Sequence, residues 1–518
     1  MVNLDLEKGN AVETTAEPEI LKPFLDAVPD YDAQNGIQTI EAMTLSWGKA
    51  SLAALLINVW LIFLTNGFRS SILYGLTPYV TSDFQSHSLF TVIGIVSDAM
   101  TAAGRAEGFL LMVGSATLVF YTIGFSGIIY TVAVLPADVT SLKNRGIAFA
   151  FTSSPYMITA FAGSKAAESL LVDVKNWRWG FGAFAIIVPV VTLSLFILLK
   201  LQLRNAEKKG LIMEETRNKW TLQYACIFIT ATIPGVFLFA GGLTVFLLPF
   251  TLAKHAPNGW KTDYIIAMII VGVVVLNKFL FDRSVIGACL IEMTYQTSYY
   301  CWNSYFSSFL QVVCNLSVAE AGYVNSTFQV VSGVLLFIVC YLIRRTGRIK
   351  WLFYVTVPIY TFDLGLMIYF RQPNVKVGFI VMCEIFISIG GSVFIRLEQL
   401  ARLAAVDHQY VAAVLALLYV SGTVGGAIGN AISGTIWTNT FLSALQRELL
   451  VNALPDVMTI YSSLSAQLAY PVGSVERLAI QAAYGYGQAR MLATGVGIFR
   501  LAFIWMFLIW NHDVSQKK

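Results

Sequence analysis

The chain has 518 residues, of which 57% are hydrophobic and only 12% are charged, and its mean hydropathy is +0.68. Because soluble domains carry about 25% charged residues, this composition excludes an ordinary soluble protein and predicts a polytopic protein of the lipid bilayer. The net charge of +4, without a basic patch interleaved with aromatic residues, gives no reason to expect a nucleic-acid partner.

Residues 1–47 hold nine acidic residues against Lys8 and Lys22. This composition predicts a disordered cytoplasmic tail, because a signal peptide would begin with basic residues followed by apolar ones. Apolar segments follow, most of them close to the roughly 20 residues that a trans-bilayer helix needs. They cover residues 49–72, 88–103, 108–137, 147–171, 177–203, 221–251, 263–281, 284–312, 323–343, 351–370, 377–401, 409–438 and 491–510.

Basic residues orient these segments, since Lys and Arg concentrate in cytoplasmic loops. They cluster around positions 105, 143–145, 204–219, 278–283, 344–350 and 402. The loops on the opposite side of the membrane from these clusters are expected outside the cell, at 81–87, 172–176, 254–262, 313–322, 371–376 and 440–490.

Cytoplasmic and outside loops should alternate along the chain, and one interval does not fit this alternation. Arg105 and Lys143 both indicate the cytoplasm, so an even number of crossings should separate them. Only residues 108–137 are available, and a helix of that length spans about 45 Å, enough for one tilted crossing and too little for two. The sequence therefore predicts that a segment is missing near residues 103–120.

The cysteines and short motifs of the chain show whether disulfides, a bound metal or a catalytic site should be expected. The six cysteines form no CxxC pair and no Cys/His ligand spacing, so we expect no disulfide framework, no protein-bound metal and no cofactor. No nucleophile–base arrangement and no Walker-type Gly-Lys-Ser/Thr sequence stands out. The chain is therefore not expected to be an enzyme or an ATP-driven transporter.

Segment 284–313 carries a carboxylate, Glu292, within membrane-grade hydrophobicity. On a helix the residues that share its face, three or four positions apart, are Tyr295, Tyr299, Trp302 and Phe306. Gln296 and Asn303 lie beside this face. Because a charge inside the bilayer is costly, we interpret the face as part of a substrate or proton pathway, with simple helix packing as the alternative.

Gly422, Gly425, Gly426 and Gly429 form two overlapping GxxxG spacings within the segment 409–438. Such spacings let a neighbouring helix approach closely in membranes. We therefore predict a helix-packing seam along this segment.

Several long blocks of the chain resemble the fungal siderophore–iron transporter family of the major facilitator superfamily. Examples are SSILYGLTPYVTSDFQSHSLFTVIGIV at 70–96, NWRWGFGAF at 176–184 and TYQTSYYCWNSYFSSFLQVV at 294–313, and the resemblance covers nearly all of 44–510. It implies an all-α fold of fourteen spans, in two six-helix bundles with two linker helices, of which about thirteen are visible here. The corresponding parts are the tail 1–47, the N-terminal bundle 48–203, a cytoplasmic loop 204–220, the linker helices 221–281 and the C-terminal bundle 284–511 with its extracellular loop 440–490.

The chain departs from this family near 103–120 and near 276–283, where the family has longer stretches. The first departure coincides with the break in the charge alternation. Either coding sequence has been lost or the protein is a shortened relative.

Proton coupling needs a group whose ionisation the transport cycle can change, and carboxylates within the spans suit this. The candidates are Glu292, Glu384 and Glu398. Arg402 lies four residues after Glu398, so an ion pair is an alternative for that residue. Asp138 and Arg145 are expected to form a gating or structural charge cluster.

A ferric siderophore carries iron that is already wrapped by oxygen ligands, so its transporter needs a wide, amphipathic cavity and no ligands of its own. The predicted substrate-binding residues are Tyr156, Tyr295, Tyr299, Trp302, Asn303 and Phe306. In the loop 440–490 a first-contact surface is predicted from Tyr461, Tyr470, Tyr484 and Tyr486. A loop packed on its own bundle is the alternative.

The resemblance implies proton-coupled uptake of ferric siderophores by a protein of the plasma membrane, monomeric by default, with an endosomal or vacuolar membrane left open. A fourteen-span drug:proton antiporter is the alternative within the same class. A non-transporting or defective membrane protein is the alternative outside it, because the first bundle is shortened.

Overall fold

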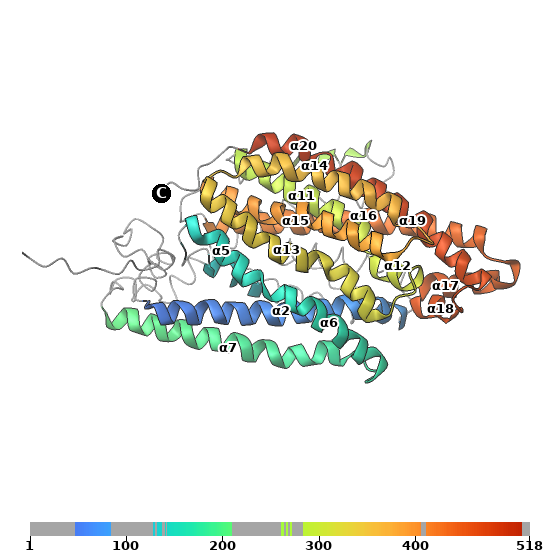
Figure 1. The fold of residues 1–518 in the computed structure, drawn as a ribbon, viewed down its shortest axis with the longest axis horizontal. Coiled ribbons are helices and arrows are strands. Elements are labelled where there is room, and N and C mark those ends of the chain that lie inside the picture. Colours follow the sequence, from blue (N-terminus) through green and yellow to red (C-terminus); the bar gives the residue numbers. More distant parts are fainter. Residues whose placement is uncertain are drawn as a thin grey trace, which may run out of the picture.

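The computed structural model describes residues 47–83, 128–129, 132–136, 140, 142–209, 261–263, 266–267, 270–271, 283–405 and 411–509. The acidic tail, the shortened interval near 103–120 and nearly all of the predicted linker helices lie outside these ranges. Within them, long helices joined by short turns run roughly parallel to one another and form two halves (Figure 1). The all-α architecture expected from the sequence is confirmed.

The N-terminal half contains α2 (Lys49–Asp83), α5 (Leu142–Ser153), α6 (Pro155–Val172) and α7 (Trp179–Lys208). The predicted span 147–171 is divided between α5 and α6 because Pro155, which has no backbone N–H, occupies the first turn of α6. The indole N–H of Trp60 donates a 3.0 Å hydrogen bond to the Ser154 hydroxyl at this junction. The break is thereby fixed against α2.

The C-terminal half contains α11 (Arg283–Asn303), α12 (Phe306–Val312), α13 (Val318–Thr346), α14 (Lys350–Phe370), α15 (Val377–Ala405), α16 (Val411–Glu448) and α19 (Val475–Phe499), followed by α20 (Ala502–Trp505) and η6 (Met506–Leu508). A capping box of Ser317 and Glu320 starts α13, and Gly347 ends it with the left-handed backbone that glycine adopts easily (φ 67°). One large apolar core holds these helices together.

The predicted extracellular loop 440–490 is shorter in the structure. Helix α16 continues to Glu448 and α19 already begins at Val475, leaving the short helices η5 (Val451–Asp456), α17 (Val457–Ser462) and α18 (Leu464–Ala469) between them. Hydropathy missed the start of α19 because its buried face is polar. For example, Gln481 and Gln488 donate hydrogen bonds to backbone carbonyls of Val312 and Tyr305.

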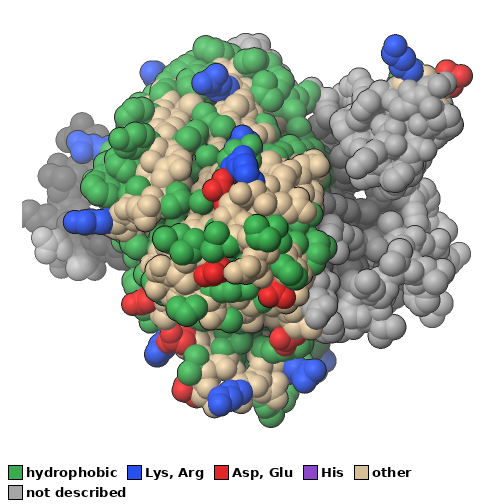
Figure 2. Space-filling view, turned by 90° about the vertical axis from the view of Figure 1, so that its right-hand side faces the viewer, with side chains coloured by type: hydrophobic (Ala, Val, Ile, Leu, Met, Phe, Trp, Pro, Cys, Tyr) green, Lys and Arg blue, Asp and Glu red, His purple; other side chains and the backbone are tan. Residues whose placement is uncertain are grey.

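The helices α12, α17 and α18 gather at one end of the molecule, and the end of α7 lies toward the opposite end (Figure 1). This first end carries the turns predicted to be extracellular, and Figure 2, which looks onto it, shows acidic and basic side chains interspersed across it. Along the flank, α7 exposes apolar side chains such as Ile186 (68%) and Val190 (64%). Such faces suit contact with lipid tails.

Five helices in the described ranges are long and apolar enough to cross a membrane. They are Ala50–Asp83, Gly182–Lys208, Val318–Thr346, Lys350–Phe370 and Val475–Leu508. The protein is therefore a multi-pass membrane protein.

Candidate functional site

A cavity of about 350 Å³ lies between the two halves. The N-terminal half contributes side chains of α2, α5 and α6, and the C-terminal half contributes side chains of α11 and α16. The lining residues that matter below are Phe63, Tyr156, Glu292, Gln296, Tyr300, Gly422 and Thr423. Because both halves form its walls, relative movement of the halves would change its shape and its access.

Glu292, Gln296 and Tyr300 are four residues apart on α11 and present one face to the cavity. The amide Nε2 of Gln296 donates a 2.8 Å hydrogen bond to Glu292 Oε1. The second oxygen, Oε2, has no hydrogen-bond partner among the described residues, although Glu292 is only 8% exposed. A buried carboxylate with one unused oxygen can accept a proton or a ligand's hydrogen bond.

Gly422 of α16 provides the space that the Glu292 carboxylate occupies. A Cβ atom at Gly422 would lie 2.9 Å from Glu292 Oε1. One and two turns further along, Gly425 and Gly429 lie against the backbone carbonyls of Met293 and Thr297. The predicted close packing along this glycine seam is confirmed, and α11 is the partner helix.

Tyr156 forms the opposite wall of the cavity from α6. Its hydroxyl accepts a 2.6 Å hydrogen bond from Asn66 Nδ2, and its ring centroid lies 6.1 Å from that of Phe63. These two contacts fix the ring against α2. The structure thus brings two predicted site residues, Tyr156 and Glu292, to one cavity from opposite halves.

The structure gives the remaining predicted aromatic residues a different environment. Tyr295, Trp302 and Phe306 are at most 2% exposed, within the core of the C-terminal half. The Tyr295 ring lies 5.5 Å from Tyr360, and Asn303 Nδ2 donates a 2.8 Å hydrogen bond to the Tyr299 hydroxyl. None of these predicted residues lines the cavity.

Arg371 explains part of this burial. Its guanidinium carbon lies 4.2 Å from the Phe306 ring centroid, and its NH1 donates a 3.2 Å hydrogen bond to the Trp302 carbonyl. That carbonyl belongs to the break between α11 and α12, where helical hydrogen bonding is interrupted. Arg371, packed on the aromatic face, therefore stabilises the break in the helix.

The other predicted carboxylates have separate positions. Glu384 of α15 is 2% exposed in the C-terminal half, and its Oε1 has no hydrogen-bond partner in the described part of the chain. The Glu398 side chain and all of Asp138 lie outside the described residues. Arg145 is buried in α5 and donates a 3.5 Å hydrogen bond to the Thr140 carbonyl.

Asp363 of α14 was not among the candidates from the sequence. It is 2% exposed, and its Oδ2 has no hydrogen-bond partner within the described ranges. It is the lone acidic residue of the apolar segment 351–370, a signal that could have found it.

The four tyrosines of the predicted contact surface are not equivalent. Tyr484 is fully buried, where its hydroxyl donates a 2.8 Å hydrogen bond to Gln467 Oε1, and Tyr461 is 9% exposed. Tyr470 is half-buried, and the Tyr486 ring is covered by Arg490 at 3.3 Å. Tyr461 and Tyr484 thus pack on their own bundle, as in the alternative interpretation, and are not available at the surface.

Two helical halves with a cavity between them are typical of the major facilitator class of membrane transporters, which are not enzymes. No family model matches the chain. Curated proteins do match: the siderophore iron transporter mirB of Emericella nidulans is 59% identical, over 95% of this chain and 89% of the relative. The MFS siderochrome iron transporter 1 of Gibberella zeae is 57% identical, over 95% and 88% respectively. The chain therefore belongs to the fungal siderophore–iron transporter family of the major facilitator superfamily.

The alignment with the Emericella nidulans protein extends over 540 positions, more than the 518 residues of this chain. The relative thus contains residues without a counterpart here. Among solved structures, a bacterial homologue of the human lysosomal transporter Spinster matches with a TM-score of 0.47 and 13% identity, over 89% of this chain and 97% of that one. This likeness is too distant to bear on the site.

Proposed function

We propose that this protein takes up ferric siderophores across the plasma membrane together with protons. The cavity between the halves would be exposed alternately to each side of the membrane as the halves rock against each other. The observation that carries the proposal is the partly unsatisfied Glu292 carboxylate within this cavity. It supplies an acidic group at the place where substrate and proton would meet.

The size of the cavity fits one stage of such a cycle. Pockets for drug-sized ligands occupy roughly 300–1,000 Å³, so about 350 Å³ lies at the small end of that range. A ferric siderophore is bulky, and the halves would have to separate to admit it. Polar wall groups such as Gln296 and Thr423 would hydrogen-bond the ligand, whose own oxygens retain the iron.

Proton coupling requires that a carboxylate exchange between a dry and a hydrated environment, because this exchange changes its affinity for the proton. Glu292 meets the requirement, since it lies where the two halves part. Glu384, which is buried in the C-terminal half, is the second candidate for coupling. If the Glu384→Gln protein keeps uptake with an unchanged dependence on external pH, Glu384 is not a coupling group.

The test is uptake of a radiolabelled ferric siderophore by a host that lacks its own siderophore transporters, with the surface level of the tagged chain recorded. Uptake that stops when the proton gradient is dissipated supports symport. Surface protein without uptake contradicts the proposal, and drug efflux by the same cells would then favour a drug:proton antiporter.

A non-transporting product is the second candidate, because the relatives contain residues that this chain lacks. No protein at the surface, together with activity restored after filling the interval near 103–120 with the relatives' sequence, would establish a damaged copy of a transporter. Normal surface level and uptake by the chain as it stands would exclude this.

A further inference from the structure

The end of α2 is hydrogen-bonded to two elements of the opposite half, at the side of the molecule predicted to be extracellular. The Tyr79 hydroxyl donates to Gln311 Oε1 of α12. One turn later, Ser82 Oγ accepts a 2.9 Å hydrogen bond from the backbone N–H of Leu464, the first residue of α18. Ser82 is 5% exposed and Leu464 is fully buried, so this second contact lies inside the interface between the halves.

The contact between Ser82 and α18 satisfies the start of a helix. The first N–H groups of a helix have no partner within it, and a buried N–H group must find a partner elsewhere. In α18 the Ser463 side chain accepts from the Ala466 N–H, while the Leu464 N–H is bound by the opposite half. A buried helix end in the predicted extracellular loop thus depends on α2 for one of its hydrogen bonds.

Helix α18 is also fixed to its own half. Gln467 Oε1 accepts a 2.8 Å hydrogen bond from the Tyr484 hydroxyl of α19, and the Gln467 carbonyl accepts from NH1 of Arg477. The NH2 group of the same guanidinium donates a 3.3 Å hydrogen bond to the Gln311 carbonyl. Because the Gln311 side chain also binds Tyr79, the helices α12, α18 and α19 form one network that meets the end of α2.

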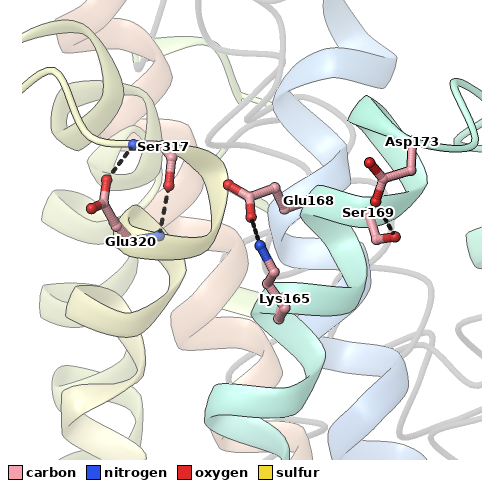
Figure 3. Close-up of polar contacts among 6 residues, drawn as sticks. All are labelled: Lys165, Glu168, Ser169, Asp173, Ser317 and Glu320. Carbon is pink, nitrogen blue, oxygen red and sulfur yellow. Dashed lines mark hydrogen bonds and ion pairs between the residues drawn. The ribbon is translucent and has the colours of Figure 1, made fainter.

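Beside this network, α6 and α13 form a closely packed seam between the halves. Gly322 of α13 lies directly against Ser164 of α6. Every ion pair and hydrogen bond drawn in Figure 3 stays within α6 or α13 and their capping residues, as between Lys165 and Glu168. The seam has to part when the outer ends of the halves separate, so its exposure reports that movement.

We propose that the loop helix α18 is the latch of the extracellular gate: while its first N–H group is bound to Ser82, the outer ends of the two halves are held together. Release of this contact, and of the neighbouring one from Tyr79, lets the outer ends part and opens the cavity to the outside. Neutral hydrogen bonds suit this role, because both partners can bond to water once the halves separate. The proposal rests on the proposed rocking of the halves and gives the extracellular loop a gating role that the sequence did not predict.

Opening of this gate can be measured without any transport. Ser164→Cys places a thiol in the closed seam, where Ser164 is 3% exposed, and its rate of reaction with a maleimide in the purified full-length chain reports how often the seam parts. Ser82→Ala leaves the Leu464 N–H without its acceptor in the closed arrangement only, since water can bind this group once the halves separate. The labelling rate should therefore rise about tenfold.

Two further variants calibrate this result. Tyr79→Phe keeps the ring and removes the hydroxyl that binds Gln311, so labelling of the Ser164→Cys thiol should rise about threefold. Thr77→Val is the matched control, because the hydrogen bond that it removes runs from the Thr77 hydroxyl to the Leu73 carbonyl within α2. It should label at the rate of the parent.

Native thiols separate a latch from a merely structural contact. Cys301 is fully buried in the C-terminal half and should react no faster in any of these variants. A parental labelling rate in the Ser82→Ala protein would overturn the proposal, and so would an equal rise at Cys301, which would show general loosening of the fold. Because no readout needs uptake, the predicted labelling in a chain that fails to transport would contradict the proposed function alone.

Discussion

Two faces of helix α11 lie side by side and have different surroundings. Glu292 and Tyr300 belong to the face that lines the cavity between the halves, whereas Tyr295 and Trp302 belong to the face that is buried in the C-terminal half. The aromatic face is the more conspicuous in the sequence, yet the face with the carboxylate is the one that contributes to the cavity wall. The difference shows that an aromatic stripe on a membrane helix can pack in the protein core and need not line a binding site.

The largest effect is expected from Glu292→Gln. This change keeps the shape of the side chain and removes the acid, so proton-driven uptake should fall about 100-fold, as for the loss of a group that exchanges a proton during the cycle. The measurement is the initial rate of ferric siderophore uptake at equal surface level. Glu207→Gln, at an exposed acid near the end of α7, is the control and should be silent.

Unchanged uptake by the Glu292→Gln protein, with the same dependence on the proton gradient, would remove Glu292 from the mechanism. It would also break the distinction between the two faces of α11.

Truncating an aromatic side chain should have different consequences in the buried core and in the cavity wall. Phe306→Ala removes a fully buried ring that Arg371 covers, at an expected cost of about 3–5 kcal/mol, so the amount of folded protein at the surface should drop. Tyr300→Ala removes a ring from the cavity wall, so the surface level should persist while KM rises about tenfold. The measurements are the surface level and the KM of both variants. Loss of surface protein for Tyr300→Ala, together with a normal surface level and a raised KM for Phe306→Ala, would contradict the account.

Gly422→Ala should have an intermediate effect. Its Cβ would meet Glu292 Oε1 at 2.9 Å, so the carboxylate must shift away from Gln296. We expect uptake to fall about fivefold without loss of surface protein, equivalent to roughly 1 kcal/mol. Gly365→Ala is the matched control, because no atom lies within 4 Å of a Cβ there. Equal uptake by both variants would show that the position of the carboxylate is not critical.

The smallest effect is expected from Tyr156→Phe. The change keeps the ring in the cavity wall and removes the hydroxyl that accepts a hydrogen bond from Asn66. Because the ring stays in place, we expect the loss of this one neutral hydrogen bond to cost about 0.5 kcal/mol, which corresponds to a KM roughly twofold higher. A KM equal to that of the parent would show that the Asn66 contact does not orient the wall.

Much of this organisation follows from the sequence. Length and hydropathy predicted the helices of both halves, and the glycine spacing of Gly422, Gly425 and Gly429 predicted a close seam. The rule that an acid within the membrane faces protein or water pointed to Glu292.

The rest could not be predicted, because hydropathy does not tell a lipid-facing residue from one that faces a neighbouring helix. For that reason the sequence grouped Glu292 with Tyr295 and Trp302. It also assigned the beginning of α19 to a loop, since polar residues such as Gln481 and Gln488 find backbone partners only in the folded bundle.

The most direct test of the account is protection of the cavity by substrate. Cysteines would be introduced one at a time at Gln296 and Thr423, which line the cavity, and at Ser443, an exposed control position near the end of α16. We predict that a ferric siderophore slows maleimide labelling at positions 296 and 423 and leaves labelling at 443 unchanged. Equal labelling rates with and without siderophore at both cavity positions would show that the substrate does not bind there, and would contradict the account.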